Sequence, residues 1–135
     1  MSYPITDIGE IDGEVAKILK SAGIRSTTRL LDRACTVSQR KTLAETTGID
    51  AKKLLCWANV ADRMRIRGVS REYADLLAAA GVLTVRDLKY RNPANLAKAM
   101  ADINKKHKLV RLVPSERVVA RWIESAKELA PKIKY

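Results

Sequence analysis

The stretch MRIRGVSREYADLLAAAGVLTVRDL, at residues 64–88, decides the fold. It begins with Ile66-Arg67-Gly68-Val69, where two apolar residues flank a glycine that can take positive φ, so we predict a tight turn. A helix follows, and its apolar stripe comprises Tyr73, Ala74, Leu76, Leu77 and Ala80. Gly81 is expected to end this helix and Thr84 to cap another. The stretch therefore predicts two helices joined by tight turns.

The same pattern occurs earlier in the chain. Residues 8–26 align without a gap on residues 66–84, at a constant offset of 58. The pairs that match in kind are Ile8/Ile66, Ile11/Val69, Glu14/Glu72, Ala16/Ala74, Leu19/Leu77, Ala22/Ala80, Gly23/Gly81 and Leu30/Leu88. Trp57-x-x-x-Ala61 also resembles Trp122-x-x-x-Ala126. An internal repeat constrains the fold more than any single motif does.

Capping residues, prolines and glycines mark the other helices. The first helix is predicted to begin at Asp12 or Gly13 and to end near Ala22. Further predicted helices run from Ser26 to about Ala34, from Ser38 to Gly48, over residues 51–61 after Asp50, from Thr84 to about Arg91, from Asn92-Pro93 through Ile103, and from Pro114-Ser115 to Pro131. Cys56 lies beside Trp57 on the helix at residues 51–61 and is predicted to be buried.

No stretch is typical of a sheet strand, so we predict an all-α fold, a compact bundle of short helices. Residues 1–63 are expected to form a first, near-neutral repeat and residues 64–135 a second, basic one. The helix at residues 51–61 would belong to both, giving one body. Residues 104–108 predict a polar, basic break, residues 108–113 a briefly extended segment, and residues 132–135 a frayed end.

The composition is that of a globular chain of one or two small domains. Of its 135 residues 47% are hydrophobic, enough for a packed core. No apolar run approaches the roughly 20 residues of a membrane span, and the N-terminal residues lack the pattern of a signal peptide. Two cysteines, Cys35 and Cys56, indicate reduced thiols rather than a disulfide framework.

The net charge of +11 is unevenly distributed. Residues 1–63 carry 10 Lys or Arg and 8 Asp or Glu, whereas residues 64–135 carry 16 and 7. This asymmetry favours a polyanionic partner for the second half. The alternative is that the charge serves solubility alone.

The turn pattern, apolar–x–Gly–apolar followed by a helix that ends in Ala-Gly, resembles the helix-hairpin-helix motif of DNA-binding proteins. The wider pattern, from Gly48-Ile49-Asp50 through Arg91-Asn92-Pro93 to Val113-Pro114-Ser115 and Trp122-Ile123, is similar to a bacterial family, domain of unknown function 4332. That resemblance implies two tandem helix-hairpin-helix (SAM-like) repeats, with no established activity. The motif itself implies contact with the DNA backbone without sequence preference.

In the helix-hairpin-helix motif, backbone N–H groups and the positive end of the helix dipole face a phosphate. This role is carried over onto Gly68, Val69, Ser70 and Arg71, where Ser70 replaces a usual glycine and can cap the helix. The first hairpin has Glu10 and Asp12 at its glycine positions. Because two carboxylates repel a phosphate, we interpret the first hairpin as structural.

Two groups of basic residues can extend the contact. Arg63, Arg65 and Arg67 alternate beside the second hairpin, and the alternatives to phosphate contact are a solvated loop or an ion pair with Asp62. A second basic run follows near the C-terminal end. The predicted nucleic-acid-binding residues are Arg65, Arg67, Gly68, Val69, Ser70, Arg71, Lys105, Lys106, Lys108 and Arg111.

Catalytic and metal-binding patterns are not evident in the sequence. Its one histidine, His107, and its two cysteines do not have metal-ligand spacing, and nothing indicates a Cys–His nucleophile. Trp57 and Trp122 are interpreted as core residues rather than base-stacking platforms. We therefore expect a protein that is not an enzyme, with no cofactor, no metal and no small-molecule substrate.

The leading hypothesis is a protein that binds double-stranded DNA through the second hairpin and a C-terminal basic surface. Base readout is not expected, and RNA fits the charge as well as DNA does. The alternative is a protein-interaction adaptor with an acidic partner, whose docking face would include the first hairpin. We expect a cytoplasmic location, associated with the nucleoid if DNA is bound, and no membrane contact.

Overall fold

The computed structural model describes residues 2–135, and within them the fold is all-helical, as predicted. One short 3-10 helix, η1, spans Ile5–Asp7. The α-helices are α1 (Gly13–Ser21), α2 (Thr27–Arg33), α3 (Val37–Thr47), α4 (Ala51–Arg63), α5 (Arg71–Ala79), α6 (Val85–Leu88), α7 (Pro93–His107) and α8 (Glu116–Glu128). The β-type pairing in this part of the chain is one isolated bridge between Pro4 and Ser26.

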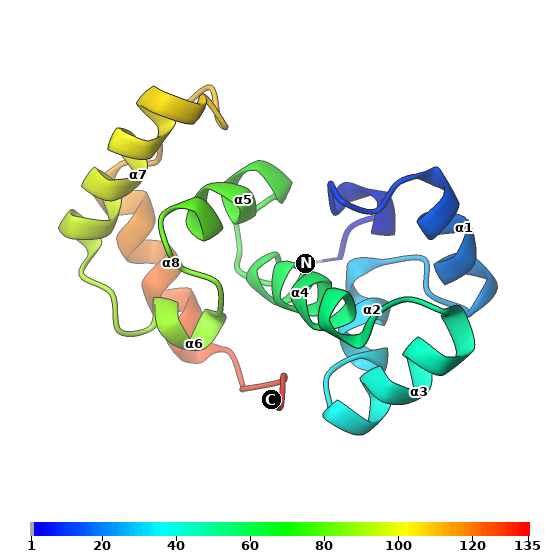
Figure 1. The fold of residues 1–135 in the computed structure, drawn as a ribbon. Coiled ribbons are helices and arrows are strands. Elements are labelled where there is room, and N and C mark those ends of the chain that lie inside the picture. The colour runs from blue at the N-terminus through cyan, green and yellow to red at the C-terminus, as the bar shows by residue number, and fades with distance from the viewer. Residues whose placement is uncertain (1) are drawn as a thin grey trace.

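Helix α4 lies in the middle of the molecule, with α1 to α3 on one side and α5 to α8 on the other (Figure 1). The buried apolar residues form two clusters, one drawn from residues 5–61 and the other from residues 64–126. Val60 of α4 packs against both clusters. Helix α4 therefore contacts both halves, although its fully buried apolar residues belong to the first cluster.

The segments at residues 8–24 and 66–82 make the same backbone hydrogen bonds at equivalent positions. The N–H of Ile11 donates to the carbonyl of Ile8 at 2.9 Å, and the N–H of Val69 donates to that of Ile66 at 3.0 Å. All four side chains are buried. We call residues 8–11 the first turn and residues 66–69 the second turn; each turn directs its apolar residues into the cluster of its own half.

The ends of α1 and α5 also match. Gly23 and Gly81 have φ values of +86° and +91°, as expected of glycines that end helices. The guanidinium of Arg33 donates to the carbonyl of Ala22, and that of Arg91 donates to the carbonyl of Gly81, both at 3.2 Å. Arg33 and Arg91 also stand 58 residues apart, although their acceptors differ by one position, since Ala22 corresponds to Ala80 rather than to Gly81.

Most of the predicted caps are present, but α3 begins differently. Ser26, Asp50 and Thr84 accept a backbone hydrogen bond as predicted, and Asp12, Asn92 and Ser115, at the predicted starts of their helices, also act as caps. The prediction that Ser38 caps α3 is wrong, because Thr36 takes the N-cap and forms a capping box with Gln39. This reciprocal pair satisfies two backbone N–H groups at once, so the helix begins before Ser38.

Helix α7 continues through the predicted break at residues 104–108 and ends at His107. Lysine is a good helix former, which lets the basic stretch remain helical. The side-chain amide of Asn104 then holds the returning chain, since it bonds both the N–H and the carbonyl of Val110 at 3.0 Å. Lys108 ends the helix with φ +48°. Residues 108–113 form no strand.

The C-terminal residues fold back onto the first half, so the prediction of a frayed end is wrong. The N–H of Lys134 donates to the carbonyl of Cys35 at 2.7 Å, and the carbonyl of Lys134 accepts from buried Arg40 at 2.7 Å. Lys132 pairs with Asp32. In Figure 1 the C-terminus accordingly lies between the two groups of helices. These partners lie about a hundred residues earlier in the chain, where local sequence rules do not reach.

Deleting residues 132–135 is expected to lower the free energy of unfolding by about 1.5 kcal/mol. Arg40 would keep its bond to the carbonyl of Ala34 but lose that of Lys134, and Ile133 would no longer pack on the first cluster. Urea unfolding followed by circular dichroism measures the change. The control is Lys132→Ala, which removes only a partly exposed ion pair and should cost less than about 0.5 kcal/mol. An unchanged urea midpoint for the deletion would mean that the tail adds no stability.

Candidate functional site

The second turn is an exposed bend whose apolar residues point inward. Ile66 and Val69 are fully buried, whereas Arg67 and Gly68 are exposed. Gly68 has φ +89°, a conformation that residues with a Cβ rarely adopt. The turn therefore presents the Arg67 side chain and the backbone at Gly68 to solvent.

Helix α5 begins directly after this turn and has no side-chain cap. Ser70 occupies the N-cap position, but its hydroxyl accepts no hydrogen bond from the helix, so the predicted cap is not formed. Each of the other seven α-helices within residues 2–135 has a side-chain cap. The N–H groups of Arg71, Glu72 and Tyr73 thus begin a helix without the acceptor that its neighbours have.

The equivalent position of the first half is filled by a carboxylate. Asp12, which corresponds to Ser70, accepts a hydrogen bond from the N–H of Val15 at 2.9 Å and so caps α1. A negative charge is favourable at a helix N-terminus, which is where an external anion would also bind. The chain's own carboxylate occupies that place at α1, whereas the start of α5 can accept an anion.

Arg65, which was predicted to contact nucleic acid, is instead bound within the protein. Its guanidinium pairs with Asp62 at 2.6 Å and also donates to the carbonyl of Ala130 at 3.1 Å. Burial raises the pKa of the Asp62 carboxyl, although Arg65 opposes this shift. Because Arg65 is already neutralised by an internal acid, we remove it from the candidate contacts. The alternative of an ion pair with Asp62 is the one that the structure contains.

Arg63 is buried rather than exposed beside the turn. Its Nε donates to the carbonyl of Ala74 at 3.2 Å and its Nη1 donates to the carbonyl of Leu83. Burial lowers the pKa of this guanidinium, while Asp75 and other neighbours oppose the shift. Arg63 therefore ties α4 to α5 and to the segment before α6, and it offers nothing to an external ligand.

Of the remaining residues predicted to bind nucleic acid near the second turn, one is held within the protein and the others are accessible. The side chain of Val69 is buried and its N–H is bonded to Ile66, so Val69 is also removed from the candidate contacts. Arg71 is exposed and lies against the first turn, since a Cβ at Gly9 would stand 3.3 Å from its Nη2. Burial raises the pKa of Asp75, and both Arg63 and Arg71 oppose that shift. Arg67 and Gly68 of the second turn and Ser70 and Arg71 at the start of α5 thus remain as candidate anion contacts.

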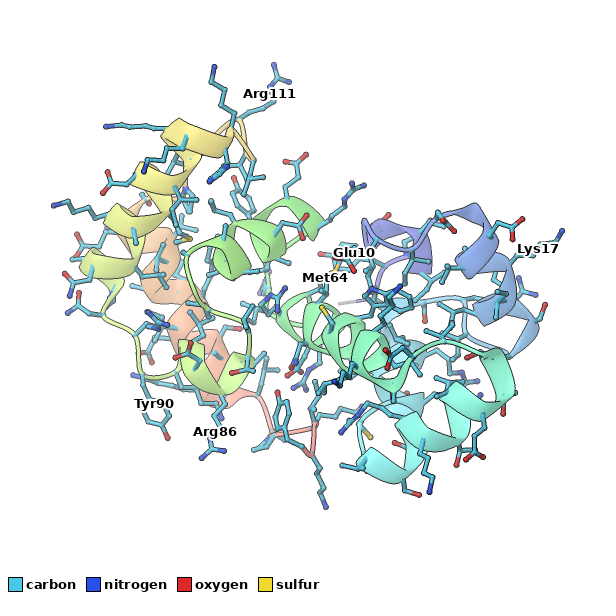
Figure 2. The ribbon with its side chains drawn as sticks, viewed as in Figure 1. Glu10, Lys17, Met64, Arg86, Tyr90 and Arg111 are labelled. Atoms are coloured by element: carbon cyan, nitrogen blue, oxygen red, sulfur yellow. The ribbon has the colours of Figure 1, made fainter. Side chains whose placement is uncertain are left out.

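The second basic run lies at the end of α7 and in the loop that follows. Lys105, Lys106, Lys108 and Arg111 are all exposed. The hydroxyl of Tyr73 on α5 donates to the carbonyl of Leu112 at 2.9 Å, which fastens this loop to α5. Arg111, next to Leu112, points away from the body in Figure 2. The Arg111 end of the run is thereby joined to the helix that starts at the second turn.

A groove of about 900 Å³ opens between the second turn and α8. Tyr73 and Trp122 supply its aromatic surface, with ring centroids 5.3 Å apart. Arg67, Arg117 and Arg121 also line it, and none of the three has an ion-pair partner within residues 2–135. Sequence reasoning missed Arg117 and Arg121, because two arginines four residues apart are usual on the exposed face of an amphipathic helix.

One family model matches residues 9–129, a range that includes both helix starts just compared and the groove beside α8 as far as Glu128. The chain belongs to the family described as a domain of unknown function (DUF4332). No solved structure matches this DUF4332 chain.

Outside the second turn and the groove, the described residues of the DUF4332 chain hold two free cysteines and no cluster of metal ligands. Within residues 2–135 no three His, Cys, Asp or Glu side chains gather as a metal site requires, and no helix combines the length and apolar character needed to cross a membrane. Cys35 and Cys56 are both free thiols. The prediction that Cys56 is buried is wrong, because α4 turns Leu54, Trp57 and Ala58 inward and leaves Cys56 exposed.

Proposed function

We propose that this DUF4332 protein is a non-enzymatic protein that binds the phosphate backbone of double-stranded DNA, largely independently of sequence. The observation that carries the proposal is the uncapped start of α5 beside exposed Arg67 and Gly68, in contrast to α1, which Asp12 caps. Backbone N–H groups at a helix N-terminus and an adjacent guanidinium are suitable donors for a phosphate oxygen.

The matched hydrogen bonds of residues 8–24 and 66–82 support the interpretation of the chain as two tandem helix-hairpin-helix units. In this proposal the first unit is structural and the second contacts DNA. Phosphate contacts position a protein but carry no sequence information, which agrees with the expectation that its helices do not read bases. The proposal includes a cytoplasmic, nucleoid-associated location in a bacterial cell.

The proposed contacts combine the second turn with the nearby basic surface. The second turn contributes Arg67 and Gly68, and the start of α5 contributes Ser70 and Arg71. The end of α7 and its loop contribute Lys105, Lys106, Lys108 and Arg111. The four basic residues at the end of α7 and in its loop are exposed, so they can contact a phosphate backbone without rearrangement of the core. The excess of positive charge in residues 64–135 also favours contact between DNA and the second half of the molecule.

Replacing Arg67 with alanine is expected to weaken binding to random duplex DNA about fivefold at low salt. Because one phosphate contact is lost, the slope of log K against log salt concentration should fall by about 0.9. Fluorescence anisotropy at several salt concentrations measures both quantities. Arg86→Ala, which removes the same charge from an exposed position on α6, is the matched control.

The proposal fails if the wild-type protein does not bind duplex DNA at low salt, or if Arg67→Ala and Arg86→Ala weaken binding equally. Duplex RNA of the same length and composition belongs in the same experiment. Tighter binding to RNA would transfer the proposal from DNA to RNA while keeping the same contacts.

A further inference from the structure

Trp57 in the first half has a carboxylate partner. Its indole N–H donates to Oε2 of Glu10 at 3.1 Å. Glu10 belongs to the first turn, and the residue at the same position of the second turn is Gly68. In the first half, a carboxylate of the first turn thus accepts the indole hydrogen bond of the tryptophan that packs behind that turn.

Trp122 packs behind the second turn without such a partner. Its Nε1 lies 3.4 Å from the point where a Cβ on Gly68 would stand, and glycine has no side chain to accept the proton. Trp122 is only 3% exposed, and within residues 2–135 no hydrogen bond satisfies its indole N–H. Every completely buried side-chain nitrogen in the described residues has a hydrogen-bond partner. Since the indole N–H of Trp122 has none, it is not completely buried, and it opens onto the groove that both Gly68 and Trp122 line.

We propose that the groove binds a segment of a partner protein that carries a carboxylate among apolar residues, with the carboxylate accepting from the indole N–H of Trp122. The partner would supply what Glu10 supplies to Trp57 within the chain. Arg67, Arg117 and Arg121, which have no ion-pair partner among residues 2–135, favour a negative group in the same groove.

Two features favour a protein segment over a nucleic acid in this groove. Glu124 and Glu128 line it toward the C-terminal end of α8, where they would repel a polyanion extending along the helix. Half-buried Tyr73, Val113 and Val118 give the groove an apolar surface that continues to Leu112, which is 75% exposed. Apolar side chains gain free energy by covering such a surface, whereas a sugar–phosphate backbone gains little.

This inference goes beyond the proposed function, because it concerns the side of the second turn that faces α8. Arg67 and Gly68 line the groove and are shared by the two proposals, whereas the other donors proposed for DNA, at the start of α5 and on the basic loop, lie outside it. A variant that removes only the indole N–H should therefore bind the protein segment more weakly and bind DNA as the wild type does. The two proposals can therefore fail separately.

The test uses the ¹⁵N-labelled full-length protein and the capped peptide acetyl-Leu-Glu-Leu-Leu-amide. The indole N–H resonance of Trp122 is expected to move downfield on titration, because it gains a carboxylate acceptor. The resonance of Trp57 should stay in place, since Glu10 already accepts from it. A peptide with glutamine in place of glutamate should bind about tenfold more weakly, because hydrogen bonds to charged acceptors are the stronger ones.

Trp122→Phe keeps an aromatic ring and removes the donor, so it should bind the glutamate peptide about tenfold more weakly and prefer glutamate over glutamine less than the wild type does, because only the arginines would still favour the charge. Because Trp122 is buried, the exposed double variant Arg117→Ala/Arg121→Ala tests the groove without altering the core. It should also weaken the glutamate peptide. Arg86→Ala/Lys17→Ala removes the same charge from two residues that lie away from the groove (Figure 2) and should bind as the wild type does.

Equal binding of the two peptides, or unchanged binding by both Trp122→Phe and the double arginine variant, overturns the proposal. A Trp122 resonance that moves with random duplex DNA but not with the peptide also overturns it and assigns the groove to nucleic acid. A resonance that moves when the protein is diluted, together with a change in sedimentation, overturns it in favour of a second copy of the chain.

Discussion

Replacing Arg63 with methionine is expected to lower the free energy of unfolding by about 3 kcal/mol. Arg63 is 3% exposed, and its guanidinium donates to the carbonyls of Ala74 and Leu83. Methionine fills much of the same space but has no donor, so both carbonyls would lose this partner. A buried polar group left unpaired costs roughly 1–3 kcal/mol.

Part of that loss is offset, because the charge of Arg63 is itself costly to bury. Burial lowers its pKa, which means that the surroundings disfavour the charged form relative to water. Removing one member of a buried polar network is nevertheless strongly destabilising in general, since its partners stay behind. The lost hydrogen bonds should therefore outweigh the relief of desolvation.

Urea unfolding of Arg63→Met, compared with Arg86→Met, measures the effect. Arg86 is exposed on α6, so its replacement should change the unfolding free energy by less than about 0.5 kcal/mol. A loss below about 1 kcal/mol for Arg63→Met would mean that other donors or water satisfy the two carbonyls. Arg63 would then not be the tie between α4 and the helices of the second half.

The helices and turns could be predicted because their signals are local. Gly81 ends α5 with positive φ and Thr84 caps α6 three residues later, so each boundary depends on a few neighbouring residues. The repeat then transferred the same assignment to residues 8–26. Where the signal was composition alone, as at residues 104–108, the prediction failed, because lysines are compatible with a helix.

The residues that gave no local signal are those whose partners lie far along the chain. Arg65 meets the carbonyl of Ala130 and Arg40 meets that of Lys134, and no spacing in the sequence indicates either contact. In the candidate site, too, the part with a local signal was predicted and the part that depends on distant contacts was not. The second turn is a contiguous motif and was predicted, whereas the groove depends on α8 packing behind that turn, so Trp122 was assigned only to the core.

Changing Ser70 to aspartate should give α5 the charged cap that Asp12 gives α1. The new carboxylate would stand where Asp12 stands at α1 and would accept from the first N–H groups of α5, which Ser70 leaves uncapped. A charged cap adds about 1 kcal/mol to the unfolding free energy. The same carboxylate would occupy and repel the proposed phosphate position, so we expect duplex DNA to bind about 50-fold more weakly.

The opposite signs of these two effects make Ser70→Asp decisive, since a merely damaged fold would lose stability and affinity together. Urea unfolding and anisotropy on the same preparation give both values. Ser70→Asn is the matched control, because its amide oxygen can cap the helix without a charge. It should stabilise the protein to a similar extent and weaken DNA binding only about fivefold, so the difference between the two variants reports the repulsion of a phosphate. If Ser70→Asp becomes more stable but still binds DNA as the wild type does, the start of α5 is not the phosphate contact.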